Sequence, residues 1–246
     1  MLLVVLAGMG AGAVNAVVGS GSLITFPTLL AVGFSPVVAN VSNNIGLVPG
    51  SISGALGFRK ELKGQGRRAR TLAMASGSGG LCGAALLLTL PSEVFDTIVP
   101  VLVLAACALM AAQPRLSIWV AGRRPENARD VGLAPMAIAF AAGIYGGYFG
   151  AAQGIILLSM LAVFVPDDLR RSNALKNVLA GIVNGVAALV FIFFADVAWN
   201  AVALVAIGAV AGGAIGATVG RRVPPQLLRT LVIVLGVAVA VRLILT

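Results

Sequence analysis

The fold is decided by residues 2–33, LLVVLAGMGAGAVNAVVGSGSLITFPTLLAVG, in which the break Gly19-Ser20-Gly21-Ser22 separates two apolar segments. As one helix this stretch would be about 32 residues and roughly 48 Å long, at 1.5 Å per residue. That is too long for a single crossing of a hydrocarbon core about 30 Å thick. We therefore predict a broken hairpin, whose two helical arms enter a membrane and return.

The composition of the chain is that of a membrane protein. Of its 246 residues, 59% are hydrophobic and 10% are charged, whereas soluble domains carry about 25% charged residues. This excludes a soluble enzyme, and the absence of histidine excludes a histidine metal site and a His-based catalytic triad. The 17 lysines and arginines lie in short segments between apolar runs, as the positive-inside rule predicts for a multi-pass inner-membrane protein. Nucleic acid is not expected as a partner.

The chain is an internal duplication. A shift of 133 positions pairs Asn40 with Asn173, Asn44 with Asn177, Phe58 with Phe191, Gly83 with Gly216 and Pro91 with Pro224. We divide the chain into a first transmembrane repeat (residues 1–113), a cytoplasmic linker (114–132) and a second transmembrane repeat (133–246). The break of the second repeat is Gly150-Ala151-Ala152-Gln153-Gly154.

Each half continues after its hairpin with three apolar segments long enough to span a bilayer, at 37–58, 71–90 and 97–112, then at 169–194, 201–219 and 227–245. Three spans are an odd number of crossings, so the second half is predicted to be inverted. The loop charges agree, because residues 59–70 hold six lysines and arginines whereas residues 192–203 hold Asp196 and no base.

The predicted fold is therefore an all-α polytopic membrane protein of two inverted repeats, each a broken-helix hairpin followed by three transmembrane helices, with the N-terminus outside. The structural alternative is that the broken elements span fully, which corresponds to about eight hydropathy segments. Four glycines at four-residue intervals predict a helix-packing face, at Gly208, Gly212, Gly216 and Gly220.

The two breaks are candidate binding elements. Residues Gly21, Ser22 and Gly154 lie where the second arms begin, and helix N-termini attract anions through free N–H groups and the helix dipole. The alternative is that these glycines only turn the chain. Gln153 is either a further hydrogen-bond donor to a ligand or a helix cap.

Polar side chains at matching positions of the two halves form a second candidate group. They are Asn40, Asn43 and Asn44 in the first half and Asn173, Lys176 and Asn177 in the second. Amides in hydrocarbon are costly unless paired or functional, so these either line a shared site or lock helices together. Lys176 lies roughly 10 Å deep by helical rise, and it is either an anion ligand or a lysine that snorkels to the surface.

Acidic residues and nucleotide motifs argue against direct coupling to protons, sodium or ATP. All eight acids lie in loops or at span ends, and no P-loop is present. An anion that leaves an inside-negative cell needs neither source of energy, since each charge gains about 2.3 kcal/mol per 100 mV.

Several stretches resemble the sulfite exporter TauE/SafE family, and the resemblance covers essentially the whole chain. They are VGSGSLITFP (residues 18–27), ANVSN (39–43), GGYFG (146–150) and NALKN (173–177). The resemblance implies transport of sulfite or of organosulfur anions such as sulfonates.

We accordingly predict an inner-membrane permease that exports sulfite, or a related small sulfur oxyanion or organosulfonate, by alternating access. The predicted partners are that anion and the lipid bilayer, with no enzyme activity, cofactor or metal; a homodimer is compatible with the sequence but not required by it. The alternatives are an importer or channel-like facilitator of the same anions, and a membrane scaffold that transports nothing.

Overall fold

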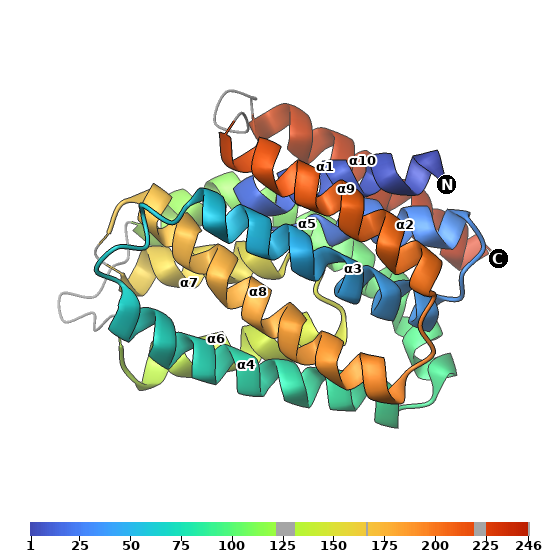
Figure 1. Cartoon of the computed structure of the whole chain (residues 1–246), viewed down its shortest axis with the longest axis horizontal. Helices are drawn as coiled ribbons and strands as arrows, with labels where there is room; N and C mark the ends of the chain where they lie inside the picture. The colour runs from blue at the N-terminus through green and yellow to red at the C-terminus, as the bar shows by residue number, and fades with distance from the viewer. Residues whose placement is uncertain (122–130, 166, 219–224, 246) are drawn as a thin grey trace.

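The computed structural model describes residues 1–121, 131–165, 167–218 and 225–245, and the regular structure in these residues is entirely α-helical (Figure 1). The first half contains α1 (Leu2–Val17), α2 (Ser22–Ala31), α3 (Pro36–Gly57), α4 (Gly66–Thr89) and α5 (Ser92–Ala121). The second half contains α6 (Leu133–Tyr148), α7 (Gln153–Phe164), α8 (Leu169–Phe194), α9 (Trp199–Thr218) and α10 (Pro225–Leu245). The prediction of a polytopic helical membrane protein is confirmed.

Both predicted breaks are present, between α1 and α2 and between α6 and α7. Gly19 and Gly150 have φ angles of +88° and +78°, a left-handed conformation that side chains disfavour, and these residues end the first arms. Ala152 also has a positive φ, of 61°, which costs a residue with a side chain about 1–2 kcal/mol. The chain thus reverses at glycine in each half, and the second half carries additional strain.

The lengths of the helices distinguish the short hairpin arms from the longer helices. Four described helices are long and apolar enough to cross a membrane, at Gly66–Thr89, Ser92–Leu116, Leu169–Phe194 and Trp199–Thr218. The hairpin arms have 16 and 10 residues in the first half and 16 and 12 in the second. An arm of 16 residues reaches only about 24 Å, which favours hairpins that enter the bilayer and return.

One boundary differs from the sequence prediction. Helix α5 continues to Ala121, so the first part of the segment assigned to the linker is helical. In the sequence, Gln113, Pro114 and Arg115 indicate a linker, but Pro114 lies inside α5, which continues past it to Ala121.

Some residues that the sequence analysis used lie outside the described part of the chain. They are the last glycine of the packing face, Gly220, and the basic residues Arg123, Arg124, Arg129, Arg221 and Arg222.

The hairpin of each half packs against a helix of the other half. Helix α1 lies along α9, and α6 lies along α4. A Cβ atom on Gly12 would approach the Gly213 nitrogen to 2.8 Å, and one on Gly83 would approach the Tyr148 nitrogen to 2.8 Å. Gly208, Gly212 and Gly216 meet the backbone of α1, as the predicted packing face requires. Backbones therefore touch where side chains would otherwise separate the helices.

The direction of each helix follows from these contacts. Gly8 meets Val205 and Gly216 meets Ala13, so α1 and α9 run in parallel. Equivalent helices of the two halves, such as α1 and α6, run in opposite directions, and both chain ends lie at the right of Figure 1. We interpret the halves as inverted repeats; their orientation in a membrane stays a prediction.

The backbone contacts at glycine predict a difference between two glycine-to-alanine variants. We expect Gly83→Ala to lower the free energy of unfolding by about 1–3 kcal/mol, because the new methyl group separates α4 from α6. Gly185→Ala is the matched control, since nothing lies within 4 Å of the added Cβ, and it should stabilise α8 by about 0.5–1 kcal/mol. Unfolding of the purified protein in detergent measures both. Equal effects of the two variants would contradict the packing described here.

Candidate functional site

The two breaks meet at the centre of the molecule. The Gly154 N–H donates a hydrogen bond of 3.0 Å to the Gly19 carbonyl. A Cβ atom on Gly19 would lie 2.6 Å from the Cα of Gly154, so neither position has room for a side chain. The tips of hairpins from opposite halves are therefore in direct backbone contact, and the N–H of Gly154 is engaged in this conformation.

Asparagines bind the carbonyl ends of the broken helices. The Nδ2 atoms of Asn173 and Asn177 donate to the Ala16 carbonyl at 3.0 and 3.1 Å. In the other half, Asn40 Nδ2 donates to the Tyr148 carbonyl at 2.9 Å. The last carbonyls of a helix lack hydrogen-bond partners within that helix. Helices α3 and α8 therefore each supply asparagine donors to the hairpin of the opposite half.

The amino group of Lys176, a residue of α8, lies at the same carbonyl end of α1. Its side chain is 0% exposed, and its Nζ donates to the Asn15 carbonyl at 3.0 Å. No carboxylate in the described part of the chain forms an ion pair with it. The side chain therefore points to the break and does not snorkel to the surface. The carbonyl end of a helix carries partial negative charge, which favours a cation there.

The other predicted residues surround these contacts. Asn43 Oδ1 accepts a hydrogen bond from Thr25 of α2, while Gly21 packs against the Ala11 carbonyl and Ser22 begins α2. Gln153 is the first residue of α7, and its side chain lies against Gly146.

Several buried polar atoms near the breaks have no hydrogen-bond partner in the described part of the chain. They are Asn44 Oδ1, Asn173 Oδ1, Gln153 Nε2 and the Tyr148 hydroxyl. Buried polar atoms are nearly always bonded to protein or water, so unbonded ones indicate where water or a ligand binds.

Sequence reasoning missed the partners of these side chains. The carbonyls of Asn15, Ala16 and Tyr148 are backbone groups, which no residue pattern marks. The available signal was their position in the last turn of a helix that is predicted to end inside the bilayer. Thr25 and an aromatic cluster beside the second break, with Phe26 and Phe149 at 5.3 Å between ring centroids, were also not anticipated.

An ionic cluster joins the halves at the basic end of the molecule. Asp167 contacts Arg171 at 2.6 Å and Arg68 of α4 at 3.1 Å. Burial raises the pKa of Asp167, but hydrogen bonds from the two arginines outweigh this and hold the pKa below its ordinary value. The neighbouring Asp168 accepts from the Arg171 N–H at 2.7 Å and caps α8.

Helices broken in pairs, with polar side chains and one lysine buried at the breaks, are features of a multi-pass membrane transporter. The chain belongs to the sulfite exporter TauE/SafE family, whose model matches residues 4–243. The probable membrane transporter protein YfcA of Escherichia coli K12 is 29% identical over 78% of this chain and 70% of its own length. The probable membrane transporter protein ORF9 of Sinorhizobium is 23% identical over 95% and 88%. No solved structure matches the chain.

The shared acceptor of Asn173 and Asn177 predicts non-additive effects. We expect either alanine variant alone to change the free energy of unfolding little, because one donor to the Ala16 carbonyl remains. The double variant leaves that carbonyl unpaired and should cost about 1–3 kcal/mol more than the sum. A double-mutant cycle in detergent measures this, with Asn173→Ala plus Asn200→Ala as an additive control. Additivity in both cycles would contradict the shared acceptor.

The Asp167 cluster predicts a stability that depends on pH. Since the folded-state pKa is lowered, the stabilisation is present above the unfolded pKa of about 3.9 and is lost as pH falls through the folded value. Asp167→Asn should therefore reduce stability at pH 7 by on the order of 1 kcal/mol and flatten its decline in acid. Thermal unfolding at several pH values, with Asp196→Asn as control, measures this. Parallel pH profiles for wild type and Asp167→Asn would refute the role of the cluster.

Proposed function

We propose that this transporter exports sulfite, or a closely related sulfur oxyanion or organosulfonate, and that the anion binds beside Lys176 between the two hairpin tips. One observation carries the proposal: Lys176 is completely buried, and its only hydrogen-bond partner in the described residues is a backbone carbonyl. A buried charge without a counter-charge is costly in a membrane and marks functional positions.

The donors at the breaks suit an oxyanion. A protonated amino group has three N–H donors, and Lys176 uses one of them on the Asn15 carbonyl. The unbonded Gln153 Nε2 supplies another buried donor on the opposite hairpin. Hydrogen bonds from charged donors to oxyanions are about twice as strong as neutral ones. An anion oxygen therefore competes well with the neutral carbonyl for Lys176.

The contact between Gly19 and Gly154 supports alternating access. It closes the centre with one backbone hydrogen bond between the tips, worth about 0.5–1.5 kcal/mol net. Because the hairpins approach from opposite ends, withdrawal of one tip opens the site toward one side only. Withdrawal of the other tip then opens it toward the opposite side.

The membrane potential supplies the driving force in this proposal. A doubly charged anion gains about 4.6 kcal/mol per 100 mV on leaving an inside-negative cell, more than a thousandfold in concentration ratio. Export then needs no coupling ion. The basic end, with the cluster of Arg68, Asp167 and Arg171, would face the cytoplasm and attract anions to the entrance.

Sulfite flux from proteoliposomes under an imposed potential tests the proposal. We expect Lys176→Ala and Lys176→Gln each to lower the flux at least tenfold, because a hydrogen bond to a charged group is worth about 1.5–3 kcal/mol. Lys60→Ala, at an exposed lysine of the α3–α4 connection, is the matched control and should keep wild-type flux. Sulfate, thiosulfate and sulfoacetate as competitors rank the anions.

The same assay distinguishes the alternatives. Flux that saturates and is accelerated by anion on the far side indicates a carrier, whereas linear flux indicates a channel-like facilitator. Accumulation of sulfite in negative-inside vesicles, against the potential, when a proton gradient is applied would favour an importer. Absence of flux for every anion, with folded protein and a proton gradient also applied, would overturn the proposal and favour a scaffold.

A further inference from the structure

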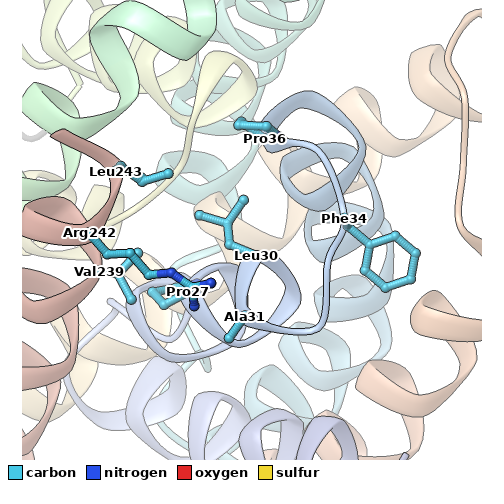
Figure 2. Close-up of a pocket in the computed structure, with 8 residues that line it drawn as sticks. All are labelled: Pro27, Leu30, Ala31, Phe34, Pro36, Val239, Arg242 and Leu243. Atoms are coloured by element: carbon cyan, nitrogen blue, oxygen red, sulfur yellow. The ribbon is translucent and has the colours of Figure 1, made fainter. Parts of the chain in front are cut away.

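A groove lies between α2 and α10 at the end of the molecule that holds both chain termini, away from the central breaks (Figure 2). Its volume is about 280 Å³. One wall comes from α2 and the connection to α3, with Pro27, Leu30 and Phe34; the other comes from α10, with Val239, Arg242 and Leu243. Figure 2 shows the Arg242 side chain extending across the groove toward Pro27.

Arg242 is unusual in its position. The other described arginines lie on or next to the connections at the opposite end, as the positive-inside rule predicts for a cytoplasmic face. Helix α10 has 21 residues, about 31 Å by helical rise. Arg242 is in its last turn, so in the predicted orientation its guanidinium lies at the level of the outer lipid headgroups.

The chemistry of the groove suits an amphipathic anion. Among the described residues, Arg242 is the only charged one that lines the groove, and the others named are apolar. A small, strongly hydrated anion would need several donors to replace its water, which this groove does not offer. A molecule with a negative head and a hydrocarbon body matches both parts, because the head meets a guanidinium suited to bidentate phosphate binding and the body meets apolar walls.

We propose that this groove binds one anionic phospholipid of the outer leaflet, with its phosphate on Arg242 and the upper part of one acyl chain against Leu30 and Leu243. A volume of about 280 Å³ equals that of roughly nine water molecules. It therefore holds part of one lipid, and the rest of the lipid stays in the bilayer.

The position of the groove gives such a lipid a regulatory role. Helix α2 is the returning arm of the first hairpin, and α10, which packs against it, is the last helix of the second half. A lipid seated between them contacts both, so its binding stabilises one position of the hairpin relative to α10. Transport that requires hairpin movement then depends on the anionic lipid content of the outer leaflet.

The test is lipid binding by the full-length protein in mixed phosphatidylcholine and phosphatidylglycerol micelles, measured by native mass spectrometry and by the apparent melting temperature. We expect one phosphatidylglycerol to be retained by the wild type and to raise the melting temperature by about 5 °C. Arg242→Gln should weaken its binding at least tenfold. Ala31→Trp, which fills the groove without removing the charge, should weaken it similarly.

Two control variants and two control ligands decide the interpretation. Arg70→Gln, at an exposed arginine of the basic end, should retain the lipid. Arg242→Lys, which keeps the charge but loses the bidentate geometry, should bind the lipid more weakly than the wild type and more tightly than Arg242→Gln. Equal phosphatidylglycerol binding by wild type, Arg242→Gln and Ala31→Trp would overturn the proposal. Stabilisation by inorganic phosphate as strong as that by phosphatidylglycerol would contradict a lipid site. Stabilisation through Arg242 by sulfite alone would assign the groove to the transport route instead.

Discussion

The structure depends on one constraint: a helix that ends inside hydrocarbon leaves backbone carbonyls that water cannot reach. Helices α1 and α6 both end among buried residues, next to Val18 and Phe149, and both ends are predicted to lie at membrane depth. Their carbonyls are bound by Asn173, Asn177 and Lys176 for one hairpin and by Asn40 for the other. In each case the donors belong to the opposite half. Neither half can therefore satisfy its own break, and the two must fold around each other.

The two halves bring different polar side chains to matching positions beside the breaks. The shift of 133 that relates the halves places Lys176 on Asn43. Asn43 is neutral and bonded to Thr25, whereas Lys176 brings an ionisable amino group to the carbonyl end of α1. Two similar hairpins thus meet at a site where, in the described residues, one half contributes a lysine and the other an amide. In the proposed mechanism the transported anion displaces the backbone carbonyl from the amino group of Lys176.

The breaks, the order of the helices and the buried polar positions could be predicted from the sequence, because each depends on the type of residue at a given position. Glycine and serine interrupt apolar runs, and asparagines recur at matching positions. The partners of Asn173 and Lys176 could not be predicted, since they are backbone carbonyls more than 150 residues away. The extension of α5 to Ala121 was missed because Pro114, which normally indicates a helix boundary, lies inside the helix.

The central claim is that the buried amino group of Lys176 binds the transported anion. The chain has only three lysines, Lys60, Lys63 and Lys176, so nitrogen NMR of protein labelled at lysine Nζ resolves each, with Lys60→Arg and Lys63→Arg for assignment. The account predicts that sulfite shifts the Lys176 signal in a saturable way and leaves the other two unchanged. A Lys176 signal unaffected by sulfite concentrations that sustain transport would contradict it.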